Sequence, residues 1–473
     1  MTVKEMNEIL NLLDESVVTE DGKLVIKNAT KLRANIHRLA EVSVLETGAK
    51  QGLARYIIRV VGNELGIYPA SIHELYLARG RGEIPAVFSV PAFNLRVLSF
   101  DAARAVFRAA IPIHASAFIF EIARSEMGYT DQRPAEYATN ILAAAIAEDY
   151  CGPIFIQGDH FQASAKRFTS DPETEIQAIK DLIIEALQAG FYNIDIDTST
   201  LVDISKATLK EQQLLNTDLS AMFTSYIRSN EPSGVTVSIG GEIGEVGGHN
   251  STVEELRAYM EGYLSELANY SKDAIGISKI SVQTGTSHGG VVLPDGSIAK
   301  VNVDFDTLMK LSQVARQDFR LGGAVQHGAS TLPEDAFGKF VESEAIEVHL
   351  ATNFQNMFFD LAPEEFRREM YAYLDQKHSS ERKSDMTDEQ FYYKTRKNAI
   401  GPFKKASWNL PRDEKDKIGS AWEKQFSKLF KYLGVSDTRK YIEDTIPPAI
   451  INPDRKFYLG ETTGGEDVSD LAD

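Results

Sequence analysis

The chain has 473 residues, and its 68 Asp and Glu outnumber its 50 Lys and Arg, which gives a formal net charge of −18. This negative charge argues against nucleic acid and anionic membrane surfaces as partners. The sequence has neither an apolar leader after its charged N-terminus nor a run of 18 apolar residues, so we expect a cytoplasmic protein without a membrane span. The length allows one large α/β domain with helical additions.

A single cysteine, Cys151, excludes an internal disulfide framework and suits a reducing compartment. It stands beside an apolar, strand-like run. We therefore expect a buried structural thiol and not a nucleophile.

Amphipathic helices are predicted before residue 80, among them 29–43 and 50–65, and a Gly/Arg-rich segment at 79–82 indicates a linker. After residue 361 the chain is polar and is cut by prolines into short predicted helices. We expect three parts: a helical N-terminal extension (1–82), a catalytic domain (83–361) and a helical C-terminal extension (362–473).

The central part alternates apolar, strand-like runs with stretches of helical periodicity. The runs are 86–90, 117–121, 153–157, 193–197, 235–239, 277–283, 322–326 and 346–350. Eight strands with intervening helices predict an α/β protein with a (β/α)8 TIM barrel, which typically needs about 250 residues. The sixth run, which contains Lys279, is the least typical of a doubly buried strand. An open doubly wound sheet is the alternative, but no glycine-rich dinucleotide motif follows the first run.

Polar residues follow five successive runs, and in a parallel barrel these positions meet at one rim. Three histidines, His160, His288 and His327, lie just after the third, sixth and seventh runs, and Glu242 lies after the fifth. Three imidazoles and a carboxylate at one rim form the ligand set of a catalytic divalent metal with an open position. Imidazole and carboxylate suit Zn²⁺ best, with Co²⁺, Mn²⁺ and Fe²⁺ open.

Glycine-rich turns follow the sixth and seventh runs, at Gly289-Gly290 and Gly328-Ala329-Ser330. Successive backbone N–H groups in such turns can point at an anion, and phosphate commonly binds after the last strands of a barrel. A purely structural role in tight turns is the alternative.

In its motifs the chain resembles the class II, metal-dependent fructose-bisphosphate and tagatose-bisphosphate aldolase family. The matching pieces are Val90-Pro91-Ala92-Phe93-Asn94, Gly158-Asp159-His160, Asp195-Ile196-Asp197-Thr198-Ser199, Glu242-Ile243-Gly244 with Gly247-Gly248, Ser287-His288-Gly289 and His327-Gly328-Ala329-Ser330. They occur in the family's order and spacing, up to about residue 360.

The resemblance implies that His160, His288 and His327 hold the metal and that Glu242 binds it in an alternative position. It implies that Asp159 is the acid/base of aldol cleavage and that Asp197 orients the reacting groups. Substrate and phosphate contacts are implied for Asn94, Gly289, Gly328, Ser330 and Thr352, and a monovalent cation is an additional expected cofactor.

The sequence departs from the family pattern at the eighth run, where His349-Leu350-Ala351-Thr352-Asn353 stands in place of NxDTD. Only Thr352 remains as a phosphate contact. His249 stands where the family has an acidic loop residue, and it could replace that enolisation base; a surface histidine is the alternative. Recognition of the phosphorylated half of the substrate is therefore expected to differ.

The activity expected from these residues is metal-dependent aldol cleavage of a ketose (bis)phosphate such as fructose 1,6-bisphosphate, giving dihydroxyacetone phosphate and an aldehyde. Two alternatives stay open: a non-catalytic companion subunit of a tagatose-bisphosphate aldolase, and another metal-dependent barrel enzyme such as an isomerase, epimerase or hydrolase. The expected partners are a phosphorylated sugar and further copies of the chain in a dimer or tetramer.

Overall fold

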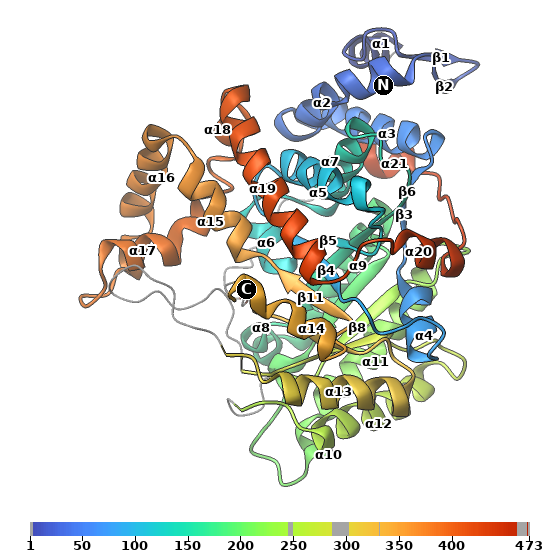
Figure 1. Ribbon diagram of the computed structural model, residues 1–473, viewed down its shortest axis with the longest axis vertical. Coiled ribbons are helices and arrows are strands. Elements are labelled where there is room, and N and C mark those ends of the chain that lie inside the picture. Colours follow the sequence, from blue (N-terminus) through green and yellow to red (C-terminus); the bar gives the residue numbers. More distant parts are fainter. Residues whose placement is uncertain (1–2, 245–248, 286–301, 331, 461–470, 472–473) are drawn as a thin grey trace.

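The computed structural model describes residues 3–244, 249–285, 302–330, 332–460 and 471 (Figure 1). Eight parallel strands in this part close into a barrel. They are β4 (Val90–Asn94), β5 (Ile119–Ala123), β6 (Gly152–Gln162), β7 (Asn193–Asp197), β8 (Ser238–Glu242), β9 (Lys279–Val282), β10 (Ala324–Gln326) and β11 (Glu347–Leu350). Each strand pairs with the next, and β11 pairs with β4. The predicted (β/α)8 barrel is confirmed, and the open sheet is ruled out.

Helices connect successive strands and surround the barrel, because parallel neighbours need crossover connections. They are α5 (Ser99–Ala110), α6 (Arg124–Tyr129), α7 (Pro134–Ala147), α8 (Ala165–Ser170), α9 (Pro172–Ala189), α10 (Leu209–Gln212), α11 (Leu214–Asn230), α12 (Val253–Tyr270), α13 (Phe305–Phe319), α14 (Gly338–Glu342) and α15 (Thr352–Leu361). Side-chain caps fix several of their starts; for example, the Asp171 carboxylate accepts a hydrogen bond from the Thr174 amide at the start of α9.

The segment before the barrel lies against its helices and its N-terminal edge. It comprises α1 (Val3–Asn11), the hairpin β1 (Val17–Glu20) and β2 (Lys23–Ile26), α2 (Ala29–Leu45), α3 (Gly48–Glu64), β3 (Ile67–Ala70) and α4 (His73–Gly80). Strand β3 was not expected, and it pairs in parallel with the start of β6.

The segment after the barrel runs back over its flank (Figure 1). It comprises α16 (Glu364–Lys377), α17 (Asp388–Thr395), α18 (Lys404–Trp408), α19 (Arg412–Tyr432), α20 (Arg439–Thr445) and α21 (Arg455–Leu459). The longest of these helices, α19, packs on α5 and α15, while Ser89, just before β4, donates its amide to the Leu433 carbonyl.

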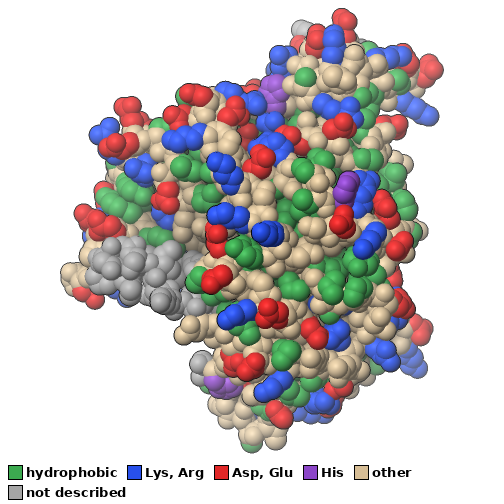
Figure 2. Space-filling view, in the orientation of Figure 1, with side chains coloured by type: hydrophobic (Ala, Val, Ile, Leu, Met, Phe, Trp, Pro, Cys, Tyr) green, Lys and Arg blue, Asp and Glu red, His purple; other side chains and the backbone are tan. Residues whose placement is uncertain are grey.

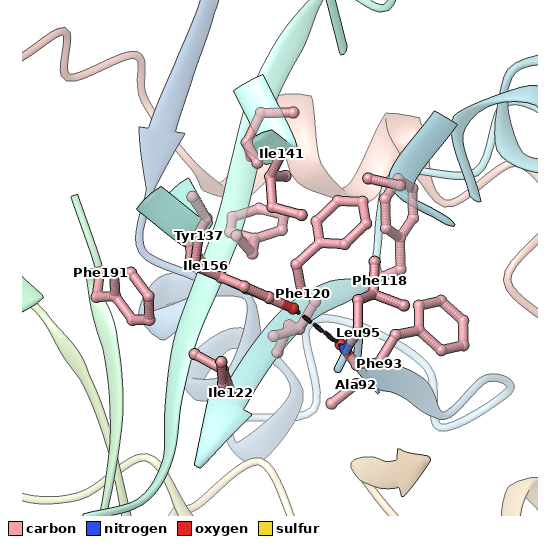
Figure 3. Packing of buried hydrophobic residues seen from close by; sticks show 14 of the residues in the cluster. Ala92, Phe93, Leu95, Phe118, Phe120, Ile122, Tyr137, Ile141, Ile156 and Phe191 are labelled. Carbon is pink, nitrogen blue, oxygen red and sulfur yellow. Dashed lines mark hydrogen bonds between the residues drawn. The ribbon is translucent and has the colours of Figure 1, made fainter. Parts of the chain in front are cut away.

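Buried aromatic side chains fill the space between the strands and the surrounding helices (Figure 3). Phe118 lies just before β5 and Phe120 lies within it. Their rings meet edge-on, with centroids 5.7 Å apart. Tyr137 of α7 donates its hydroxyl to the Glu121 carbonyl at 2.6 Å, so the helix is fixed to the strand by a polar contact inside an apolar layer.

Acidic and basic side chains are interspersed over the face seen in Figure 2. No helix in the described part of the chain is long and apolar enough to cross a bilayer.

Three local expectations were wrong. The first strand begins at Val90 and not at residue 86. Arg79, expected in a linker, is buried in α4 and donates to the Phe88 and Glu344 carbonyls, so it joins this helix to the underside of the barrel. Cys151 is exposed, because it lies in the turn before β6 with its Sγ 3.7 Å from the Gly66 carbonyl.

Candidate functional site

Polar and charged side chains line the interior of the barrel, where branched apolar residues usually stack in layers. The inward-facing residues are Glu121, Gln157, Asp195, Lys279, Glu347 and His349, and all are buried. They come from five strands. A buried charge opposes folding unless a partner compensates it. The contacts among these side chains therefore determine which of them can be charged.

Lys279 carries the compensating charge in the lower part of the interior. Its Nζ lies 2.8 Å from Gln157 Oε1 and 2.9 Å from Asp195, and it also pairs with Glu347. Burial opposes a charged amine, but Asp195 and Glu347 outweigh it and raise the pKa of Lys279 to about 12. These contacts favour the charged form of Lys279, whereas an amine that attacks a carbonyl must be neutral.

His349 lies near four carboxylates, of which Asp195 is the most distant, with its Oδ2 3.8 Å from His349 Nε2. Its Nε2 is 2.6 Å from Glu347 Oε1, and its Nδ1 is 3.2 Å from both Glu121 Oε1 and Asp159 Oδ1. Burial raises the pKa of Glu121 to about 8, since desolvation outweighs the attraction of His349. From the sequence, His349 was expected only as part of the altered eighth run, and Glu121 was given no role.

His160 and His327 meet at the rim. His160 Nε2 lies 3.1 Å from His327 Nδ1. The opposite nitrogens are held in place, because His160 Nδ1 lies 3.0 Å from Asp197 Oδ2 and His327 Nε2 lies 3.0 Å from Ser281 Oγ. The strands from which these residues come are not neighbours, so only the closed barrel brings the two rings together.

A backbone irregularity aims the His160 ring at this point. The register of β6 against β7 shifts between Gly158 and Phe161, and His160 has a φ of 40°. Left-handed backbone is strained for a non-glycine residue, and bulges re-aim side chains beside functional sites. The strain at His160 is thus part of the geometry that joins it to His327.

Glu242, at the end of β8, places its Oε2 3.7 Å from His327 Nε2. Burial and the nearby Asp197 raise the pKa of Glu242 to about 8. His288 and Gly289 lie outside the described residues.

The donor set fits a divalent metal ion. Two ring nitrogens 3.1 Å apart match the separation of two ligands of one ion, each about 2.1 Å from it. A carboxylate that fixes the far nitrogen of a ligating histidine, as Asp197 does for His160, is the usual support of such a site. Two overlapping groups of donor atoms lie within 4.8 Å of one another here. The first joins His327 of this pair to Asp159 and His349, and the second contains Glu121, Asp159, Asp195 and His349.

Asp159 lies beside the histidine pair, with its Oδ1 3.8 Å from His160 Nε2. Its Oδ2 accepts a hydrogen bond from Asn94 Nδ2 at 3.0 Å, and Asn94 also donates to Glu126 at 2.9 Å. Burial opposes its charge, but His160 and His349 hold the pKa of Asp159 well below its usual range. Asn94 therefore contacts the predicted acid/base and fixes its orientation.

The remaining predicted residues are less closely associated with this centre. His249 is exposed, and its ring lies 2.9 Å from the Asn250 carbonyl and 4.0 Å from Glu255. Ser330 Oγ accepts a hydrogen bond from the Ala351 amide at 2.7 Å, and Thr352 begins α15 as a buried residue. Gly328 has a φ of 68°, which explains a glycine in that turn.

A pattern in the sequence could have revealed the missed residues. Glu347 and His349 alternate with the apolar Val348 and Leu350 along β11, so both charges share one face of that strand. Neither residue lies beyond the end of the strand, where ligating residues of a barrel were expected.

The fold and these side chains define a (β/α)8 barrel with a buried cluster of histidines and carboxylates that could bind a metal ion. Residues 86–406, more than half of the chain, match the model of the family described as fructose-bisphosphate aldolase class-II, and the chain belongs to that family. No curated protein sequence matches the chain.

Several solved structures are similar to the chain. The fructuronate-tagaturonate epimerase UxaE of Cohnella laeviribosi is 13% identical, with 89% of this chain and 90% of that chain covered and a TM-score of 0.53. A probable tagatose 6 phosphate kinase of Sinorhizobium meliloti is 13% identical (78% and 97% covered, TM-score 0.50). A fructose-bisphosphate aldolase of Campylobacter jejuni is 18% identical (76% and 93% covered, TM-score 0.46). At these identities the first two likenesses show a shared fold alone.

Proposed function

We propose that the chain is a metal-dependent lyase that cleaves a ketose phosphate reversibly between C3 and C4, giving dihydroxyacetone phosphate and an aldehyde. The observation that carries this proposal is the pairing of His160 and His327, 3.1 Å apart, with Asp159 beside them at the same rim. Membership of the class II family supports this reaction type.

His160 and His327 would hold the ion, with His288 as a third ligand and Glu242 in an alternative position. A bound Zn²⁺, Co²⁺, Mn²⁺ or Fe²⁺ would polarise the ketone as a Lewis acid. The chain's own groups supply the proton transfer: Asp159 would take the proton of the C4 hydroxyl in cleavage and return it to the aldehyde oxygen in condensation. Asn94 would keep Asp159 in position, and Asp197 would orient His160. His249 as the enolisation base and a monovalent cation as a further cofactor stay predictions.

Phosphate contacts are proposed for Gly289, Gly328, Ser330 and Thr352. Because the Ser330 hydroxyl already accepts from Ala351 and the eighth run lacks the family's carboxylates, we propose that the phosphorylated half is bound differently from the family pattern.

A second candidate is an epimerase that acts on an unphosphorylated keto acid. The altered eighth run favours it, since no phosphate contact is needed for such a substrate. The fructuronate-tagaturonate epimerase of Cohnella laeviribosi, whose fold covers 89% of this chain, suggests fructuronate and tagaturonate as sugars to test. Cleavage and re-addition at one C–C bond would use the same acid/base and metal.

The test is turnover of fructose 1,6-bisphosphate, tagatose 1,6-bisphosphate, fructuronate and tagaturonate by the purified chain. Each assay is run after EDTA treatment and after adding back Zn²⁺, Co²⁺ or Mn²⁺. Chelator-sensitive release of a triose phosphate supports the lyase, and interconversion of the uronates without release supports the epimerase. Failure to bind a metal and to act on any sugar would contradict both and favour the companion subunit.

We also propose a cytoplasmic homo-oligomer built from three parts, 1–82, 83–361 and 362–473. The presence of a single cysteine supports a reducing compartment such as the cytoplasm. Apolar side chains are exposed near α10 and α11, at Ile204, Leu214 and Leu215, and they support a surface for contact between copies of the chain. Size-exclusion chromatography with light scattering tests the subunit count.

A further inference from the structure

Three donor atoms converge inside the barrel, from Glu121, Asp159 and His349. Glu121 Oε1 and Asp159 Oδ1 each lie 3.2 Å from His349 Nδ1. The three side chains are between 0% and 7% exposed, and none of these three atoms makes a hydrogen bond. Buried polar atoms normally have a partner, so three such atoms facing one another indicate a common missing ligand.

The other polar atom of each side chain is held by a neighbour. His349 Nε2 lies 2.6 Å from Glu347 Oε1, Glu121 Oε2 accepts from Gln157 Nε2 at 2.8 Å, and Asp159 Oδ2 accepts from Asn94 Nδ2 at 3.0 Å. These contacts turn the three unbonded atoms toward one point. Hydrogen bonds to the far atom of a ligand are how proteins orient metal-binding histidines and carboxylates.

A protonated His349 pairs with both carboxylates at 3.2 Å, but it has only one hydrogen at Nδ1. That hydrogen can satisfy one of the two carboxylate oxygens and leaves the other without a hydrogen bond. Donor atoms separated by 3.2 Å match two ligands about 2.1 to 2.2 Å from one ion at roughly a right angle.

We propose that Glu121, Asp159 and His349 form a second divalent cation site, separate from the His160 and His327 pair. One imidazole and two carboxylates suit Mn²⁺ or Fe²⁺. Asp195 belongs to the same group of donors within 4.8 Å and can supply a fourth oxygen.

The charges of the interior favour a cation there. Four carboxylic side chains, Glu121, Asp159, Asp195 and Glu347, surround one lysine, Lys279, and the His349 ring, which is neutral when it binds a metal. Asp159 lies 3.8 Å from His160 Nε2 as well, so its carboxylate stands between the two sites. Two ions sharing one carboxylate is a recurrent arrangement in proteins that bind two metals.

The test is metal stoichiometry on the full chain loaded with Mn²⁺ after EDTA treatment and dialysis, measured by mass spectrometry of the metal. Wild type should bind two ions per chain. Glu121→Gln and His349→Gln should each bind one, and His160→Ala should also bind one. The doubly substituted His160→Ala, His349→Gln chain should bind none. His378→Gln, a change at a partly buried histidine in the C-terminal extension, is the matched control and should keep two.

Electron paramagnetic resonance adds a signature that loss of folding would not imitate. Two neighbouring Mn²⁺ ions should give an exchange-coupled spectrum in wild type, and each single substitution should leave an isolated-ion spectrum. If the substituted chains do not fold, anomalous diffraction from Mn²⁺-loaded wild-type crystals locates the ions directly.

A wild type that binds one ion would overturn the proposal, as would His349→Gln retaining two. If the wild type bound one ion and neither His160→Ala nor His349→Gln bound any, the two groups of residues would form a single shared site. Two ions in a chain inactive on every sugar would reject the proposed lyase and keep the second site, so the two failures are distinguishable.

Discussion

At the scale of single residues, the centre depends on how the side chains are oriented. His160 has left-handed backbone at a bulge, and its ring is held by Asp197, which also accepts from Ser199 Oγ at 2.6 Å and Gln162 Nε2 at 2.7 Å. The Ser199 amide also donates to Asp197, and a carboxylate with four partners has little freedom to move. His160 is therefore presented to His327 in one orientation, at the cost of local strain.

Asp197→Asn should weaken binding of the ion at the His160 and His327 pair by about 10- to 100-fold, because the amide cannot support the ring as the carboxylate does. Competition with a fluorescent chelator measures the affinity. Asp203→Asn, an exposed change that also removes a carboxylate bonded to a serine, is the control and should have no effect. Equal affinity in both variants would remove Asp197 from the support of His160.

Asp159→Ala should keep the ion at the histidine pair and lower turnover by on the order of 10²–10⁴-fold, as expected for loss of a general acid/base. Steady-state kinetics on the accepted sugar, with metal content measured in parallel, tests this. Asp101→Asn, at a buried carboxylate of α5, should turn over normally. Normal turnover in Asp159→Ala would exclude Asp159 from the mechanism.

At the scale of elements, α19 is part of the barrel's packing and not an appendage. Its Phe426 ring lies 4.9 Å from Phe93 of β4 and 4.7 Å from Phe354 of α15, and Trp422 Nε1 donates to the Phe354 carbonyl at 3.1 Å. Phe93 directly precedes Asn94, which orients Asp159. The C-terminal extension thus supports the strand whose Asn94 contacts Asp159, the proposed acid/base.

Phe426→Ala should lower the free energy of unfolding by about 3–5 kcal/mol, because it leaves a cavity among buried rings. Urea denaturation followed by circular dichroism measures this. Lys424→Ala, at an exposed position of the same helix, should change stability by less than about 0.5 kcal/mol. A small effect of Phe426→Ala would mean that α19 folds independently of the barrel.

Helix α4 carries a buried histidine, His73, whose two ring nitrogens make no hydrogen bond. Burial, with Arg228 and Arg81 acting in the same direction, lowers the pKa of His73 from 6.5 to about 3. Below pH 6.5 the unfolded chain therefore binds a proton that the folded chain does not. Stability is lost as the pH falls through this window, by about 1.4 kcal/mol per pH unit.

His73→Leu should remove this contribution. Between about pH 6 and 5 the free energy of unfolding should fall less in the variant than in wild type. Above pH 7, where this histidine is neutral in both the folded and the unfolded chain, the free energies of the two chains should change with pH in the same way. Unfolding free energies in urea across this range measure the slope. Identical slopes in the two chains would show that His73 is protonated in the folded state.

At the scale of the whole molecule, closing eight strands gathers charge into a volume that is normally apolar. Lys279 and Glu347 form a buried pair, and Lys279 with His349 lowers the pKa of Glu347 to about 2 against the effect of burial. Buried charge opposes folding unless compensated. A bound cation would therefore stabilise the folded barrel as well as supply chemistry.

Chelation should lower the unfolding temperature. Metal at about 100 times its dissociation constant adds about 2.7 kcal/mol of stability through its binding to the folded state alone. Differential scanning calorimetry with EDTA, then with Zn²⁺ or Mn²⁺ restored, measures the shift. His160→Ala should show a smaller shift than wild type, and an unchanged unfolding temperature in wild type would mean that no tight metal site exists.

Local sequence was sufficient to predict the alternation of strands and helices and the residues that follow the strands. Run 193–197 agrees with β7 in both bounds, because it is short, has alternating apolar residues and is followed by turn residues. Since parallel strands in a barrel share one rim, the placement of His160, Asp197, Glu242 and His327 near one another followed from the order of the runs alone.

Tertiary structure alone decided which side chains fill the barrel. Whether Glu121, Lys279 and His349 point inward depends on strand register and closure, and a one-residue difference in register would reverse their faces. The same holds for Arg79 and for α19, whose partners lie far away in sequence. The sequence alone therefore determined the fold class and the rim, whereas closure of the barrel decided which partners the buried charges meet, because those contacts join residues that are far apart in the sequence.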